Sequence, residues 1–178
     1  MTPGREVAGA RWPTEYAATM VEVGHPAPDF VLQSDSGETV RLSDLRGRPV
    51  VVYFYPRDDT PGCTRQACAI RDSWSEFERA GATVIGISPQ SVESHVKFRE
   101  KFSLPFPLLA DEDHAVASAY GAWGPKTRYG KTRDGLIRSG FVINGDGTVA
   151  AAKVNVNADK HREWALAELA KLHAPAAR

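Results

Sequence analysis

Short apolar runs alternate with amphipathic segments along the middle of the chain. The runs PVVVYFYP at 49–56 and ATVIGIS at 82–88 are rich in β-branched and aromatic residues and too short for typical helices, and PLLAD at 107–111 is a shorter run. Such runs are typical of strands buried on both faces of a sheet. Apolar residues at helical spacing predict a helix from about 61 to 80 and another within 91–102. The alternation predicts an α/β domain with parallel strands.

Weaker patterns flank this central region. Residues 29–33 and 39–42 are predicted to be short strands on either side of the turn SDSGE, followed by a helical turn at 43–45. The segment at 139–154 contains two apolar stretches joined by NGDG, which indicates a β-hairpin. The segment HREWALAELAKLH at 161–173 has the spacing of a closing amphipathic helix.

The first twenty residues lack this patterning. They mix Pro, Gly, Arg and Glu without periodicity, and no continuous apolar core typical of a secretory signal is found there. We therefore expect a flexible N-terminal extension at 1–20 and one domain at 21–175, and Met20 could be an alternative start.

Composition narrows the class of protein. The 178 residues are 42% hydrophobic and 25% charged, as in soluble globular proteins, and this length suits one domain. Lys plus Arg equals Asp plus Glu at 22 each, so no basic excess favours nucleic acid. No apolar segment approaches the roughly 18 residues of a membrane helix. We expect a cytoplasmic protein without a nucleic-acid or membrane partner.

The only two cysteines, Cys63 and Cys68, lie in TPGCTRQAC, directly after the first buried run. Thr60 is a favourable helix N-cap, and Pro61 suits the first helical position. At about 100° per residue, Cys63 begins an apolar stripe that continues through Ala67, whereas Cys68 lies about 140° away on a more polar flank. An intracellular cysteine pair is more often reactive or metal-binding than a structural bridge.

The spacing of the two cysteines leaves two interpretations open. Positions five apart in a helix have Cα atoms roughly 8 to 9 Å apart, whereas a disulfide needs less than about 7 Å. Either the thiols never meet, or the start of the helix unwinds when they do. A thiol in the first helical turn is close to the positive end of the helix dipole, which favours the nucleophilic thiolate. This placement favours a reactive pair over two unconnected structural cysteines.

Several sequence blocks together resemble a known family. PRDDTPGC has the pattern P-x-x-x-T-x-x-C after a buried strand, and this resembles the active-site motif of the peroxiredoxins. The second cysteine in TPGCTRQACAIRD is similar to the subgroup called peroxiredoxin Q or bacterioferritin comigratory protein. The resemblance continues through VIGISPQSVESHVKF, LPFPLLADED and YGAWGPKTRYGKTRDGLIRSGFVI, from about Val23 to the final helix.

This resemblance implies a single-domain thioredoxin-like fold with a central mixed sheet flanked by helices. It implies that Cys63 is the peroxidatic cysteine, Cys68 the resolving one and Arg138 the active-site arginine. Thr60 would hydrogen-bond the thiolate and the peroxide, and Pro56 would shield the pocket from water; their simpler roles would be helix cap and strand terminator. The protein would reduce hydrogen peroxide and organic hydroperoxides through a Cys63–Cys68 disulfide.

The implied partners are hydroperoxide substrates and a thiol donor, thioredoxin or a relative such as glutaredoxin. Because both thiols belong to one chain, a monomer suffices. No nucleotide-binding loop is found, so no cofactor is expected.

Other activities compete with this interpretation. A thioredoxin-type disulfide reductase or a thiol-dependent chaperone suits the fold class, although C-x-x-C is missing, and a binding module without catalysis is a third option. A metal site would need histidines beside the cysteines, but their spacing matches no usual zinc pattern, and most are expected to face solvent. The histidines are His25, His95, His114, His161 and His173.

Overall fold

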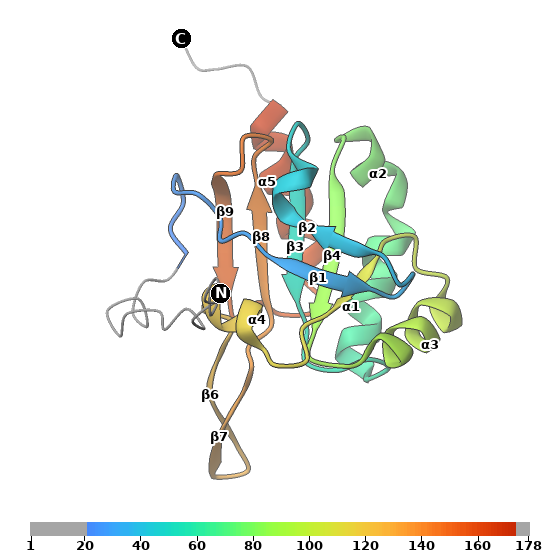
Figure 1. Ribbon diagram of the computed structural model, residues 1–178, viewed down its shortest axis with the longest axis vertical. Coiled ribbons are helices and arrows are strands. Elements are labelled where there is room, and N and C mark those ends of the chain that lie inside the picture. The colour runs from blue at the N-terminus through green and yellow to red at the C-terminus, as the bar shows by residue number, and fades with distance from the viewer. Residues whose placement is uncertain (1–20, 174–178) are drawn as a thin grey trace, which may run out of the picture.

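A seven-stranded sheet forms the centre of the computed structural model, which describes residues 21–173 (Figure 1). The strand order across the sheet is β2-β1-β5-β4-β3-β8-β9. Strands β3, β4 and β5 are parallel, whereas β1, β2, β8 and β9 pair antiparallel with their neighbours, so the sheet is mixed. The strand bounds are β1 Val31–Ser34, β2 Thr39–Arg41, β3 Val50–Phe54, β4 Thr83–Ser88, β5 Leu108–Ala110, β8 Ser139–Ile143 and β9 Val149–Val154.

The predicted strand at 49–56 is confirmed as β3, which lies near the middle of the sheet. It pairs with β4 on one side and β8 on the other, and all five of its side chains are buried. A continuous apolar run is required here because both faces of the strand are covered. The other predicted strands are also found, and the hairpin at 139–154 is formed by β8 and β9.

Helices cover both faces of the sheet. Tyr53 and the face it belongs to pack against α1, α2, α3 and α5, whereas Phe54 and the opposite face pack against α4 and the 3-10 turn η2. The two apolar clusters are therefore separated by the sheet itself. The helix bounds are η2 Leu42–Leu45, α1 Pro61–Asp72, α2 Trp74–Arg79, α3 Val92–Phe102, α4 Ala115–Ala119 and α5 His161–His173.

The predicted single helix from 61 to 80 is wrong, because the helix is interrupted at Ser73. Ser73 has φ −106° and ψ 19°, and it separates α1 from α2. Its hydroxyl accepts a hydrogen bond from Arg162 Nη1 of α5 at 2.9 Å. Trp74 and Phe77 still reach the core after the break, so the apolar stripe continues although the helix does not.

A second, two-stranded sheet was not predicted from the sequence. Strands β6 (Trp123–Arg128) and β7 (Lys131–Leu136) form a hairpin that projects from one end of the molecule (Figure 1). Its strands carry Lys, Thr and Arg instead of alternating apolar side chains, because its outer part packs against no core. We call residues 123–136 the basic arm.

The predicted N-terminal extension, residues 1–20, lies outside the described residues. Within residues 21–173 no helix is both long and apolar enough to cross a membrane.

Candidate active site

Cys63 lies in the first turn of α1, just beyond the carboxyl end of β3. The chain leaves β3 at Phe54 and enters α1 at Pro61, and the first helical hydrogen bond runs from Thr64 N to Thr60 O at 2.8 Å. The Cys63 side chain is 2% exposed and belongs to the same apolar cluster as Ala67. The prediction that Cys63 begins the core-facing stripe of this helix is confirmed.

Arg138 meets this thiol from the other side. It directly precedes β8, whose first residue, Ser139, pairs with Phe54 at the end of β3, so the sheet brings residues 63 and 138 together. Arg138 Nη2 donates a hydrogen bond to Cys63 Sγ at 3.3 Å. A guanidinium at this distance stabilises negative charge on sulfur.

Gln66 completes the contact and was missed by the sequence analysis. Its side chain is fully buried, and Gln66 Oε1 accepts a hydrogen bond from Arg138 Nη1. Gln66 lies one helical turn after Cys63, so one guanidinium binds two side chains of α1. A buried glutamine three residues after Cys63 can be recognised only once the helix and its buried face are known.

Gly62 allows this close approach. A Cβ atom at position 62 would lie 3.2 Å from Arg138 Nη2, closer than most van der Waals contacts. A larger residue at this position would move the guanidinium or the helix start. The glycine of TPGC therefore has a packing role beside the thiol.

Thr60 is at the N-cap position of α1, but its side chain does not cap the helix. Thr60 Oγ1 instead donates its proton to Arg57 O at 2.9 Å. The hydroxyl is then an acceptor toward any group in the site. Pro56 is half-buried at the start of the same loop.

Cys68 is half-buried on the flank of α1, and both cysteines are free thiols in this structure. Both lie within α1, and positions five apart in a regular helix have Cα atoms roughly 8 to 9 Å apart, too far for a disulfide. A disulfide between these two residues requires rearrangement of α1.

A buried polar network holds the loop before α1. Asp58 accepts hydrogen bonds from Tyr55 Oη at 2.6 Å and from Ser94 Oγ at 2.7 Å, and His95 Nδ1 lies 2.7 Å from its carboxylate. His95 Nε2 must donate to Leu109 O, 3.0 Å away, because a carbonyl only accepts. Burial, followed by the charge of Asp58, raises the pKa of Tyr55 well above its usual value. This network connects residues 56–60 to α3 and β5.

Another buried histidine lies beneath the site. His161, the first residue of α5, is completely buried, and its ring packs against Tyr53 with centroids 5.2 Å apart. Within residues 21–173, neither ring nitrogen has a hydrogen-bond partner, and Tyr53 Oη and Gln66 Nε2 also lack one. Burial, and secondarily the charge of Arg138, lowers the pKa of His161 to about 3. His95 and His161 thus depart from the expectation that most histidines face solvent.

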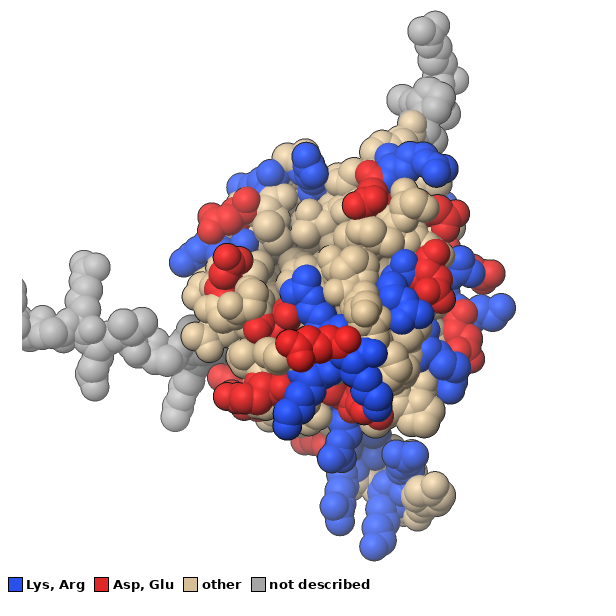
Figure 2. Space-filling view, turned by 90° about the vertical axis from the view of Figure 1, so that its right-hand side faces the viewer, with Lys and Arg blue, Asp and Glu red and all other residues tan. Residues whose placement is uncertain are grey.

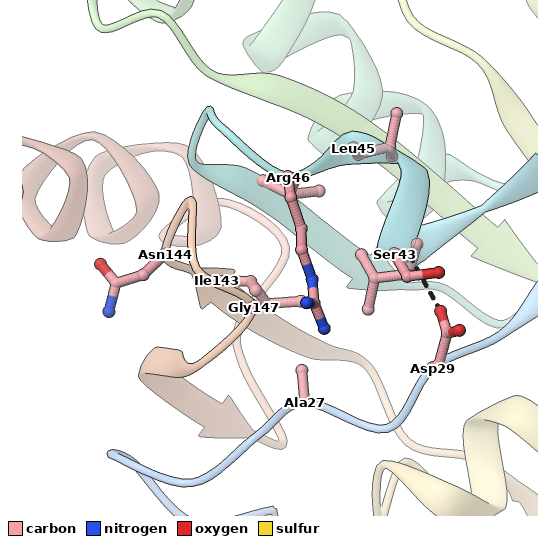
Figure 3. A pocket seen from close by; sticks show the side chains of 10 residues that line it. Ala27, Asp29, Ser43, Leu45, Arg46, Ile143, Asn144 and Gly147 are labelled. Atoms are coloured by element: carbon pink, nitrogen blue, oxygen red, sulfur yellow. Dashed lines mark hydrogen bonds between the residues drawn. The ribbon is translucent and has the colours of Figure 1, made fainter.

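A separate pocket lies at the other end of β3 (Figure 3). Arg46 extends into it beside Ser43, whose backbone N–H donates to Asp29 Oδ1 at 2.9 Å. Val50, the first residue of β3, also lines this pocket, whereas Cys63 lies beyond the last residue of β3. No nucleophilic thiol lines this pocket, so the candidate active site is the one around Cys63. Among residues 21–173, no three His, Cys, Asp or Glu side chains gather to hold a metal ion.

A mixed sheet flanked by helices, with a thiol in the first turn of the helix after a central strand and an arginine hydrogen-bonded to it, defines a thiol-dependent redox protein of thioredoxin-like fold. Comparison with known proteins gives the family. Residues 23–152 match the family model described as AhpC/TSA family, and the chain belongs to this family.

Individual relatives agree with this assignment. Peroxiredoxin Bcp of Bacillus subtilis is 46% identical over 149 residues, covering 84% of this chain and 95% of that protein. Peroxiredoxin Bcp of Escherichia coli is 44% identical over 146 residues, covering 82% and 94%. A solved structure of the Xanthomonas campestris bacterioferritin comigratory protein, from a study of its alkyl peroxide reduction, superposes with TM-score 0.79 at 35% identity, covering 86% of this chain and all of that one. The resemblance to the peroxiredoxin Q subgroup is confirmed.

Proposed function

We propose that this protein is a thiol-dependent peroxidase that reduces hydrogen peroxide and organic hydroperoxides, alkyl peroxides among them. The observation that carries the proposal is the 3.3 Å hydrogen bond from Arg138 Nη2 to Cys63 Sγ at the start of α1. A charged donor beside a sulfur in the first helical turn favours thiolate, which is the form that attacks peroxides.

The first half-reaction oxidises Cys63. Its thiolate attacks one peroxide oxygen, the O–O bond breaks, and the departing oxygen takes a proton to leave as water or an alcohol. Sulfur is oxidised to sulfenic acid, and the peroxide is reduced by two electrons. The Arg138 guanidinium, held beside Cys63 just before β8, stabilises the negative charge that develops on the departing oxygen.

The second half-reaction uses Cys68. Its thiol condenses with the sulfenic acid, so that a Cys63–Cys68 disulfide forms and water leaves. Because the two positions are too far apart in a regular helix, the first turns of α1 unwind before the bond closes. Cys63 is thus assigned the peroxidatic role and Cys68 the resolving role.

Thr60 and Pro56 are assigned supporting roles at the mouth of the site. With its only proton donated to Arg57 O, the Thr60 hydroxyl accepts a hydrogen bond from a peroxide O–H and orients it toward Cys63. Pro56 offers no N–H and covers the loop with an apolar ring, which limits water at the thiolate.

The cycle ends when an external dithiol, thioredoxin or a related donor, reduces the disulfide and is itself oxidised to a disulfide. We place this reaction in the cytoplasm, where such donors are maintained in reduced form. Both thiols come from one chain, so the protein acts as a monomer.

The experiment that tests the function measures intact mass and free thiols of the reduced protein before and after one equivalent of hydrogen peroxide, without reductant. We expect both thiols to disappear with a loss of about two mass units in a monomer. Two thiols that remain free after minutes would overturn the peroxidase assignment in favour of a disulfide reductase.

Matched cysteine variants separate the two roles. Cys68→Ser should consume one equivalent of peroxide, retain an oxidised Cys63 and fail to cycle with thioredoxin. Cys63→Ser should consume none. If Cys63→Ser retained full turnover, the assignment of the two roles would be wrong.

A further inference from the structure

The basic arm presents four cations on a single face. In its register Lys126 lies opposite Arg133, and Arg128 lies opposite Lys131. Because side chains two residues apart in a strand share a face, these two cross-strand pairs point to the same side of the ribbon. Thr127 and Thr132, between them, occupy the other face, where their hydroxyls are 2.9 Å apart.

This arrangement is electrostatically unfavourable for the isolated protein. Like charges directly opposite each other destabilise a hairpin, and the arm contains two such pairs. In the described part of the chain, no carboxylate forms an ion pair with any of the four cations. The one acidic residue of the arm, Asp134, lies opposite Pro125 and therefore on the other face. Figure 2 shows the Lys and Arg side chains of the arm extending from the lower end of the molecule.

The turn at the tip of the arm places an exposed tyrosine in an unfavourable backbone conformation, which does not stabilise the fold. Tyr129 and Gly130 form the two-residue turn with φ of 53° and 74°, a conformation for which Asn-Gly is the favoured pair. Tyrosine pays a steric cost there, yet its ring is 92% exposed and contributes nothing to a core. Arg128 lies 5.6 Å from the centroid of this ring. Tyrosine and arginine are the residue types enriched at the centres of protein interfaces.

The base of the arm lies beside the candidate active site. Strand β7 ends at Leu136, two residues before Arg138, and Lys126 Nζ donates to Leu136 O at 2.7 Å. Partial burial, followed by the charges of Arg138 and Arg128, lowers the pKa of Lys126, so the cations of the arm and of the site influence one another. A partner that reaches the base of the cationic face at Lys126 is therefore close to Arg138, which contacts Cys63.

We propose that the cationic face of the basic arm is the docking surface for the thiol donor, and that the donor carries an acidic surface beside its reactive thiols. This inference rests on the proposed function, whose cycle requires one protein partner at this end of the molecule, whereas a small peroxide needs no such arm. With six residues per strand the arm is roughly 20 Å long, so its charges act beyond the molecular surface and guide an acidic partner.

The test uses two synthetic dithiol peptides that differ only in four glutamates or four lysines beside their cysteines, with uncharged dithiothreitol as a third reductant. Wild-type protein is first converted to its disulfide with one equivalent of peroxide, and the second-order rate of its reduction is then measured. We expect the acidic peptide to react about tenfold faster than the basic one at low ionic strength, and the difference to disappear near about 0.5 M salt.

Three double variants localise the effect, and the two glutamate pairs have equal net charge. Arg128→Glu with Lys131→Glu should abolish or invert the preference for the acidic peptide, and the neutral pair Arg128→Gln with Lys131→Gln should abolish it. Arg46→Glu with Arg48→Glu, which precedes β3 at the opposite end of the sheet, should retain it. Dithiothreitol should reduce all four proteins at one rate, which shows that the site itself is unchanged.

Several results would overturn the docking proposal. Wild-type protein could react equally with both peptides, or the Arg46 and Arg48 variant could lose the preference as fully as the arm variant. Retention of wild-type protein on phosphatidylserine vesicles or duplex DNA, without any preference between the peptides, would assign the arm to a different partner. A failure of the proposed function is distinguishable, because it would occur earlier, when peroxide alone leaves both thiols free.

Discussion

At the scale of single residues, Arg138 connects the Cys63 sulfur to the rest of the protein. One of its amino groups donates to Cys63 Sγ and the other to Gln66, while its backbone carbonyl accepts from Val156 N at 2.8 Å. Arg138 is thus fixed both at its guanidinium and at its backbone. A group fixed in this way can stabilise developing charge without reorganising during the reaction.

Replacement of Arg138 should therefore slow the first half-reaction specifically. We expect Arg138→Met to reduce the second-order rate of Cys63 oxidation by about 10² to 10³ fold, the cost of removing one preorganised charged donor. Arg138→Lys should fall between this variant and wild type, because an ammonium retains charge but cannot bind Cys63 and Gln66 together. Stopped-flow measurement of peroxide consumption would give these rates.

The matched control is Arg133→Met, which removes an arginine from the basic arm and leaves the site intact. Its rate with hydrogen peroxide should equal that of wild type. If Arg138→Met were as fast as this control, Arg138 would be a structural residue only.

The sequence revealed the residues of the site to different degrees. Cys63 was predicted by residue chemistry and helical position, because both depend on neighbours along the chain. Arg138 came only from the family resemblance, since 75 residues separate it from Cys63 and only the pairing of β3 with β8 joins them. Gln66 and His161 were not identified, because a polar side chain gives no sign in the sequence that it is buried.

At the scale of elements, the loop before α1 is fixed by more contacts than the first turn of α1 itself. The loop before it is fixed to α3 and β5 through Asp58 and His95, and Asp59 pairs with Lys101 of α3 at 2.7 Å. The first turn of α1 contains Gly62, which has low helix propensity. Unwinding needed for the disulfide should therefore be confined to the helix and should not extend into the loop.

Amide hydrogen exchange can test this boundary. On oxidation to the disulfide, amides between 61 and 70 should lose protection, whereas those of β3 and α3 should retain it. Equal protection of residues 61–70 in reduced and oxidised protein would contradict the unwinding. Loss of protection in α3 to the same extent would show that the Asp58 network does not limit the change.

Each difference between predicted and observed elements has a physical cause that the apolar pattern does not show. The helix break at Ser73 coincides with a hydrogen bond from Arg162, 89 residues away, which apolar spacing does not reveal. The basic arm has no apolar alternation and could not be recognised as strands by pattern. The buried strands were predicted because a central strand must be apolar along its whole length.

At the scale of the whole molecule, the layer between sheet and helices encloses buried polar groups that have no hydrogen-bond partner in the described part of the chain. His161 lies between Tyr53 of β3 and Trp164 of α5, and a Cβ on Gly140 of β8 would lie 2.6 Å from its Nε2. No room exists there for a solvated imidazolium. The fold thus requires His161 to be neutral, and this requirement affects global stability.

The free energy of unfolding should therefore fall in acid, and part of this fall should come from His161 alone. Unfolded histidine titrates near 6.5, but His161 in the folded protein has a pKa of about 3. Between these values the unfolded chain binds a proton that the folded chain excludes, so stability decreases as pH falls from about 6.5 toward 3. The slope from this one group approaches about 1.4 kcal/mol per pH unit. Above pH 6.5 it contributes nothing.

His161→Phe keeps an aromatic ring in this layer and removes the titration, so the difference in unfolding free energy between variant and wild type should shift in favour of the variant as pH falls. Urea unfolding at a series of pH values measures that difference, and carboxylates common to both proteins cancel from it. His25→Phe, at an exposed position, is the control and should not shift in favour of the variant in acid, because it removes only a surface contact with Glu22. Parallel curves for His161→Phe would mean that the layer opens enough for the imidazole to be protonated without unfolding, and the closed packing beneath Arg138 would then not describe the protein in acid.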